Sequence, residues 1–172
     1  MIPRIKNILY TTDLSKNSAY AFRYAIHSAQ RYDANIHIFH VIETVPPSAE
    51  GILQWVIAPE KLGKIRQETK ESLMKGIENR LMEFTRRELK DDSAALLQVA
   101  SVKVVFGDPA VEILREAEDP KYDIVILGTH GKGIVGHTFL GSVSEKVLHR
   151  ISKPVFIIPL PKGETNITLE EI

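Results

Sequence analysis

Short apolar runs alternate with longer amphipathic stretches along this chain. Five runs have the length and composition of strands, at 5–10, 34–42, 98–106, 123–127 and 154–159. Between them, apolar residues recur every three or four positions, as on one face of a helix, at 15–33, 62–90, 109–119 and 142–150. The run at 123–127 is nearly all apolar, which is typical of a strand that is covered on both faces.

Strand and helix patterns that alternate in this way predict an α/β fold, in which a parallel sheet carries helices on both faces and its crossovers are right-handed. Ligands bind such sheets at the carboxyl ends of the strands. Polar or glycine-containing segments follow the predicted strands there, at 11–13, 107–109 and 128–141. We therefore expect the functional residues to lie along one edge of the sheet.

Composition narrows the class of protein. A chain of 172 residues fits one domain with a single core. Its 22 Lys and Arg residues balance 22 Asp and Glu residues, so no global charge favours nucleic acid or an anionic membrane as a partner. The absence of cysteine excludes disulfides and thiolate chemistry. Because no apolar run has the length of a signal peptide or a membrane span, we expect a cytoplasmic protein.

The segment from Leu127 to Val143 contains five glycines between a predicted strand and a predicted helix. Glycines allow backbone N–H groups to approach an anion closely, so this arrangement favours phosphate binding. Ser142, with Glu145 three residues later, matches a helix-capping box. Residues 131–136 fit the dinucleotide pattern G-x-G-x-x-G, but no acidic residue follows at 151–159. A P-loop is excluded as well, because Lys132 is followed by glycine rather than by Ser or Thr.

The spacing Gly128-x2-Gly131-x9-Gly141-Ser142 resembles the nucleotide-binding motif of the universal stress protein family. The resemblance extends over about residues 3–160. Four further segments carry it, at 6–15, 40–41, 107–109 and 152–155. Thr11 departs from the family pattern, in which many members have proline, but it removes no proposed ligand.

This resemblance implies an open, Rossmann-like, five-stranded parallel sheet of order 3-2-1-4-5, in a single domain at 1–160 with a flexible tail at 161–172. It also implies ATP, with Mg²⁺ or Mn²⁺ bound through the phosphates. The implied nucleotide-binding residues are Thr12, Asp13, Val41, Gly128, Gly131, Gly141, Ser142 and Val143. Asp13 and the backbone of Val41 would face ribose and adenine, and the glycines, Ser142 and the N–H of Val143 would hold the phosphates. A homodimer would form by edge pairing of strand 154–159.

The resemblance favours an ATP-binding switch or sensor in stress response that acts through a protein partner. No general base stands at a recognisable spacing from a nucleophile, which argues against an enzyme. A slow ATPase that uses His130 or His137 remains an alternative. A further alternative is a nucleotide-independent interaction module that docks its partner through segment 43–60, which contains Trp55.

Asp13 could also cap the first helix. His37 and His40 are three apart on a strand and therefore cannot share one metal ion.

Overall fold

A computed structural model describes residues 2–44, 59–129 and 140–159 of the 172, with the side chains of 59–66 excepted. Three predicted features lie outside these ranges. They are most of the segment with Trp55, the tail, and the middle of the glycine-rich segment, which includes Gly131, Lys132 and both candidate histidines, His130 and His137.

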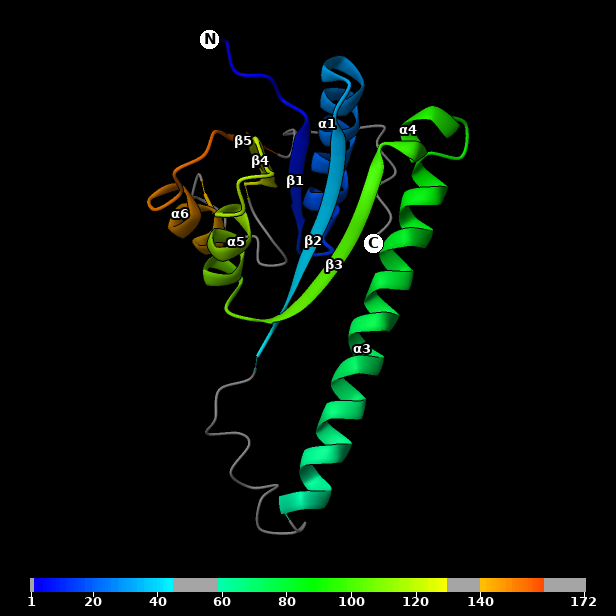
Figure 1. Ribbon diagram of the computed structural model, residues 1–172, viewed down its shortest axis with the longest axis vertical. Helices are drawn as coiled ribbons and strands as arrows, with labels where there is room; N and C mark the ends of the chain where they lie inside the picture. The colour runs from blue at the N-terminus through cyan, green and yellow to red at the C-terminus, as the bar shows by residue number, and fades with distance from the viewer. Residues whose placement is uncertain (1, 45–58, 130–139, 160–172) are drawn as a thin grey trace.

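The described residues form one five-stranded parallel sheet with flanking helices (Figure 1). The strands are β1 (Asn7–Thr12), β2 (Asn35–Glu43), β3 (Val99–Gly107), β4 (Ile124–Gly128) and β5 (Val155–Ile158). The helices are α1 (Lys16–Tyr32), α3 (Pro59–Glu88), α4 (Ser93–Leu97), α5 (Pro109–Ala117) and α6 (Ser142–Leu148). The strand order is β3-β2-β1-β4-β5, which confirms the predicted α/β class and topology.

Alternating residues of the strands belong to two apolar clusters, one on each face of the sheet. On β1, Ile8 and Tyr10 pack with α1, α3 and α4, whereas Leu9 packs with α5 and α6. β4 divides in the same way, with Ile126 in the first cluster and Leu127 in the second. The central strands are thus buried on both faces, as their nearly continuous apolar sequence predicts.

The structure departs from the sequence prediction at β1 and at α4. β1 runs two residues further than predicted, to Thr12, because its backbone pairs with β2 up to the contact of Thr12 with His40. The short helix α4 was not predicted, since five residues are too few to show helical periodicity. Its start is fixed by Asp92, whose side chain accepts a hydrogen bond from the N–H of Ala95.

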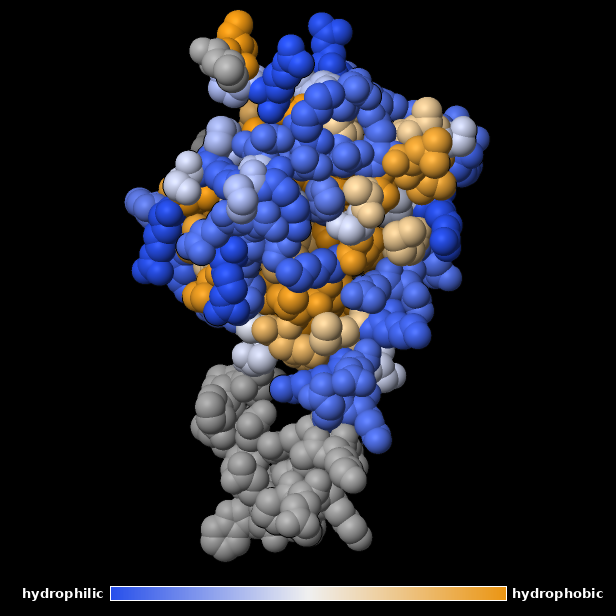
Figure 2. Space-filling view, viewed as in Figure 1, coloured by the Kyte–Doolittle hydropathy of each residue, from blue (hydrophilic) through white to orange (hydrophobic). Residues whose placement is uncertain are grey.

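Helix α3 is 30 residues long and extends past the carboxyl edge of the sheet (Figure 1). Of its 30 residues, 14 are charged. No helix in the described ranges is long and apolar enough to cross a membrane. Figure 2 shows apolar surface in the lower middle of the body, near the carboxyl edge of the sheet, with largely polar surface around it.

Candidate functional site

The predicted site residues lie along the carboxyl edge of three adjacent strands. Thr12 on β1 is level with His40 on β2. On the other side, Tyr10 pairs with Ile126 of β4, which places Gly128 level with Thr12. Neighbouring strands lie about 4.8 Å apart. Asp13 and Val41 follow Thr12 and His40 directly, so the topology brings Asp13, Val41 and Gly128 to one stretch of this edge.

The turn after β1 holds the Asp13 carboxylate in place. Its Oδ1 accepts a hydrogen bond from the Ser15 hydroxyl at 2.6 Å and one from the Ser15 N–H at 3.1 Å. Its second oxygen, Oδ2, has no hydrogen-bond partner in the described part of the chain and is available to a ligand hydroxyl. Leu14, between the two residues, adopts a left-handed φ of 66°, a conformation that is uncommon for leucine and concentrates at functional sites.

The N-cap of α1 is Ser15, so the alternative in which Asp13 caps this helix is wrong. The Ser15 side chain accepts from the N–H of Ser18, three residues into the helix. Asp13 lies two residues before the cap, where its carboxylate can reach only the cap residue itself. Asp13 therefore orients the cap and does not compete for the helix N–H groups.

Thr12 and His40 tie the ends of β1 and β2 together. The Thr12 hydroxyl donates to the Ser18 hydroxyl at 2.9 Å and accepts from the N–H of Leu14 at 3.0 Å. The Thr12 carbonyl accepts a hydrogen bond of 2.7 Å from Nδ1 of His40, so this nitrogen carries a proton. Both residues are buried. Thr12 thus supports the position of Asp13 from inside the turn.

Gly128 ends β4 under a close contact from α1. A Cβ atom on Gly128 would lie 2.8 Å from Nδ2 and 3.1 Å from Cγ of Asn17, a residue in the first turn of α1 that is only 5% exposed. Any side chain at position 128 would therefore displace Asn17. The glycine is required here by close approach of a neighbouring element.

The peptide unit between Gly128 and Thr129 is fixed at both of its polar ends. The Gly128 carbonyl accepts from the Ser144 hydroxyl at 2.8 Å, and the Thr129 N–H donates to the Ile158 carbonyl at 3.1 Å. The Thr129 carbonyl in turn accepts from the N–H of Gly141 at 2.7 Å. The two ends of the glycine-rich segment are thus joined directly.

Helix α6 begins one residue earlier than the capping box predicts. Its N-cap is Gly141, and Ser142 is its first helical residue, so the prediction that Ser142 caps the helix is wrong. Tertiary contact decides the start, because the Gly141 N–H is bound to Thr129 while its carbonyl accepts from the N–H of Glu145. Gly141 has no side chain with which to satisfy the first-turn donors, which include the N–H groups of Ser142 and Val143.

The Val41 side chain is buried in the cluster beneath α5, which leaves only its backbone available at the edge of the sheet. His37 and His40 hydrogen-bond to different groups. Nδ1 of His37 lies 2.8 Å from the Ser101 hydroxyl, and Nε2 lies 3.2 Å from Oδ1 of Asn7. Burial, and then the nearby Lys121 cation, lower the pKa of His37. Within the described ranges, no three His, Asp or Glu side chains gather to form a metal site.

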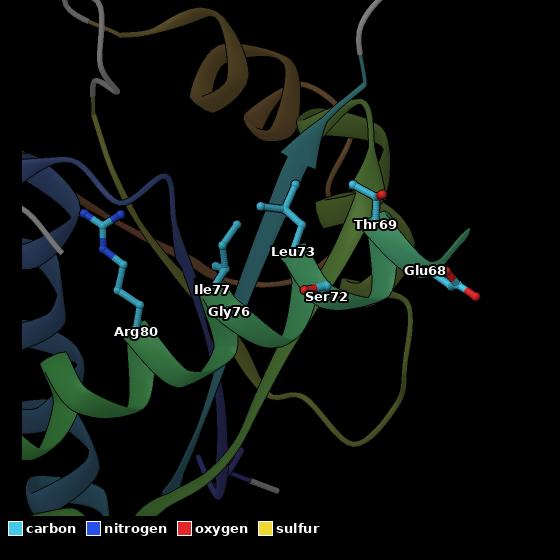
Figure 3. A pocket seen from close by; sticks show the side chains of 7 residues that line it. All are labelled: Glu68, Thr69, Ser72, Leu73, Gly76, Ile77 and Arg80. Atoms are coloured by element: carbon cyan, nitrogen blue, oxygen red, sulfur yellow. The ribbon is translucent and has the colours of Figure 1, made fainter. Parts of the chain in front are cut away.

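A hollow of about 680 Å³ lies along α3 (Figure 3). It is lined by Glu68, Thr69, Ser72, Leu73, Gly76, Ile77 and Arg80. Leu73 and Ile77, one helical turn apart, point to the same side of α3 in Figure 3. None of the predicted nucleotide-site residues that the structure describes lines this hollow.

Sequence reasoning missed three residues that shape the site: Asn17, His40 as a tie between strands, and Ser144. All three are polar and buried at the carboxyl edge. A polar residue that interrupts the apolar face of a helix is the signal that could have identified Asn17 and Ser144. The sequence alone does not show what such a residue contacts.

Taken together, the parallel sheet, its strand order and the residues at its carboxyl edge define an α/β protein of the Rossmann-like type. Comparison with known proteins then identifies the family. A model of the Universal stress protein family matches residues 4–159, and the chain belongs to this family.

Relatives and solved structures agree with this assignment. The universal stress protein MJ0577 of Methanocaldococcus jannaschii is 30% identical over 157 residues, which cover 89% of this chain and 94% of that protein. A universal stress protein of Thermus aquaticus is 31% identical over 158 residues, covering 89% of this chain and 98% of that protein. The solved structure of MJ0577 superposes with a TM-score of 0.68 at 28% identity and covers 94% of this chain and all of that one.

More distant structures share the fold. A universal stress protein in complex with cAMP has a TM-score of 0.52 at 19% identity, covering 91% of this chain and 98% of that one. A family protein from Arabidopsis thaliana with AMP bound has a TM-score of 0.53 at 17% identity, covering 91% of this chain and 93% of that one.

Proposed function

We propose that this chain binds ATP, with Mg²⁺ or Mn²⁺ held through the phosphates, and acts as a nucleotide-dependent switch or sensor in stress response. The observation that carries the proposal is the convergence of Asp13, Val41, Gly128 and the start of α6 on one edge of the sheet. Two distant relatives of the same fold were solved with cAMP and AMP, which supports an adenine nucleotide as the ligand class.

Each part of the ligand has a matching group at this edge. Oδ2 of Asp13 can accept a hydrogen bond from a ribose hydroxyl, and a charged acceptor makes such a bond strong. The backbone of Val41 would lie against the base. Ser142 and Val143 would donate to the phosphates from the first turn of α6, and the glycines at 128, 131 and 141 would let the backbone come close to them. Asp13 is the one carboxylate in this set, so the proposal assigns the cation to the phosphates.

Titration calorimetry with ATP and Mg²⁺ tests the proposal. Wild-type protein should bind about one ATP per chain, and Asp13→Asn should weaken binding about tenfold through loss of a charge-assisted bond to ribose. Asp33→Asn is the matched control, because Asp33 is an exposed aspartate at the far end of α1 and should leave the affinity unchanged. Absence of saturable ATP binding by the wild-type protein would refute the proposal.

The fate of the bound nucleotide separates a switch from a slow ATPase. ATP should be recovered intact after prolonged incubation. Recovery of ADP, with loss of turnover in His130→Ala or His137→Ala, would instead support the enzyme alternative. Retention of a protein partner by Gly131→Val would support the nucleotide-independent module.

We also propose that the protein is a homodimer joined through β5, at residues 154–159. β5 is the last strand in the sheet order and pairs only with β4 among the described strands, so one side of its backbone is open. Open strand edges are natural pairing sites. Sedimentation equilibrium should give twice the chain mass at micromolar concentration, and a monomeric mass would contradict the dimer.

A further inference from the structure

The first turn of α6 is tied to the end of β4 at two points. The Gly141 N–H binds the Thr129 carbonyl at 2.7 Å, and the Ser144 hydroxyl binds the Gly128 carbonyl at 2.8 Å. Between the two points lie Ser142 and Val143, the residues assigned to the phosphates. The placement of these two residues therefore depends on the ties on either side of them.

The second tie depends on a side chain, whereas the first is a backbone contact that any residue could make. We propose that Ser144 is a positioning residue for phosphate binding, and this inference rests on the proposed function. Ser144 is 6% exposed, and its hydroxyl donates to a backbone carbonyl 16 residues earlier in the chain. Ser144 lies outside the family's glycine motif, which ends at Ser142.

Ser144 acts on the site in two physical ways. It holds the Gly128 carbonyl toward α6, so that the negative end of this dipole does not turn toward bound phosphates. It also fixes the first turn of α6 before the ligand arrives, which reduces the ordering that binding must otherwise bring about. Both effects concern the phosphates and leave the contacts of ribose and base unchanged.

The discriminating measurement is therefore the affinity for ATP compared with that for adenosine, each by titration calorimetry. Ser144→Ala should weaken ATP binding about tenfold, a typical consequence of an orphaned buried carbonyl, and leave adenosine binding within about twofold of wild type. Ser144→Thr keeps the hydroxyl and should restore ATP affinity to within about threefold. If Ser144→Ala does not fold, Ser144→Cys keeps the volume with a weaker donor and should show the same split.

Thr85 offers a matched control. Its hydroxyl is fully buried and donates to the Leu81 carbonyl at 2.8 Å within α3, far along the chain from the site. Thr85→Val removes a buried side-chain hydrogen bond of the same length and keeps the shape of the side chain. Both affinities should stay at their wild-type values.

Amide hydrogen exchange tests the same geometry in the absence of ligand. The N–H groups of Thr129 and Gly141 are both hydrogen-bonded in the tied arrangement. Amide exchange of these two groups should accelerate at least about fivefold in Ser144→Ala relative to Thr85→Val, since their protection reflects local opening.

The outcomes separate this inference from the proposed function. If the wild type binds ATP and Ser144→Ala binds it equally well, the positioning role is refuted and the proposed function stands. If Ser144→Ala weakens ATP and adenosine to the same extent, Ser144 serves general stability and the inference is again refuted. If the wild type binds no ATP, both fail.

Discussion

Substitution of Gly128 by alanine tests the close packing of α1 against the end of β4. The new Cβ would lie 2.8 Å from Nδ2 of Asn17, so the Asn17 amide must retreat by about 0.6 Å to reach ordinary contact. Asn17 is buried in the first turn of α1 and has little room to move. Overpacking of this kind costs about 1–3 kcal/mol.

A smaller effect acts in the opposite direction. Gly128 does not adopt a left-handed φ, so alanine fits its backbone and stabilises through the unfolded state by about 0.4–1 kcal/mol. We therefore expect Gly128→Ala to lower the free energy of unfolding by about 1–2 kcal/mol, measured by urea denaturation. For a chain of this size, that corresponds to a Tm lower by about 2–8 °C.

Two further variants make the test specific. Gly76 lies within α3 with no atom near its would-be Cβ, so Gly76→Ala should stabilise by about 0.5–1 kcal/mol. Asn17→Ala removes the obstructing amide, so the double variant with Gly128→Ala should be less destabilised than the sum of the two single variants. A coupling free energy below about 0.5 kcal/mol, the usual value for independent sites, would refute the close-contact explanation.

Three other predictions concern the turn after β1 and the opposite end of the sheet. Leu14→Gly should be more stable than Leu14→Ala by about 0.5–1 kcal/mol in urea denaturation, because only glycine adopts a φ of 66° without strain. The reverse order of stability would exclude the left-handed turn. Burial and then Lys121 lower the pKa of His37 below its ordinary 6.5, so the unfolded chain binds more protons and stability should fall as pH drops below 6.5. His37→Asn should flatten this pH dependence of the urea midpoint, and an unchanged slope would contradict the assignment. Asp123 accepts hydrogen bonds from the backbone N–H groups of Lys6 and Asn7 at 2.7 and 2.8 Å. Asp123→Ala should therefore lower the free energy of unfolding by about 2–3 kcal/mol, and Asp123→Asn by less, because the amide oxygen can still accept. An unchanged free energy of unfolding in Asp123→Ala would contradict this role.

Hydrophobic patterning predicted the strands and most helices, because a strand buried on both faces requires an unbroken apolar run. It also predicted that the candidate residues share one edge, since parallel strands all end on the same side of the sheet. The strand order came from the family resemblance, because apolar periodicity does not encode which strands are neighbours. The order β3-β2-β1-β4-β5 confirms that resemblance.

The local errors have a common physical cause, which is that tertiary hydrogen bonds decide what the local sequence leaves open. Ser142 and Glu145 match a capping box by sequence. The hydrogen bond from the Gly141 N–H to the Thr129 carbonyl instead places Gly141 in the cap position, so α6 starts one residue earlier. Asp13 is an equally good cap by residue type, yet Ser15 takes that role. In both cases the competing residue lies within two positions in the sequence, so propensity alone cannot distinguish the two.

The two halves of the proposed site are held in the same manner. On α1, the Ser15 hydroxyl donates to the Asp13 carboxylate at 2.6 Å, and on α6, the Ser144 hydroxyl donates to the Gly128 carbonyl at 2.8 Å. Each serine lies in or beside the first turn of its helix and fixes an acceptor on the preceding strand end. On α6 the Ser144 hydroxyl does this without occupying the N–H groups of Ser142 and Val143, whereas the Ser15 hydroxyl also accepts from the N–H of Ser18. In the proposed site the roles would be separate: the two serines orient the neighbouring groups, and Asp13 and the backbone of α6 would contact the nucleotide.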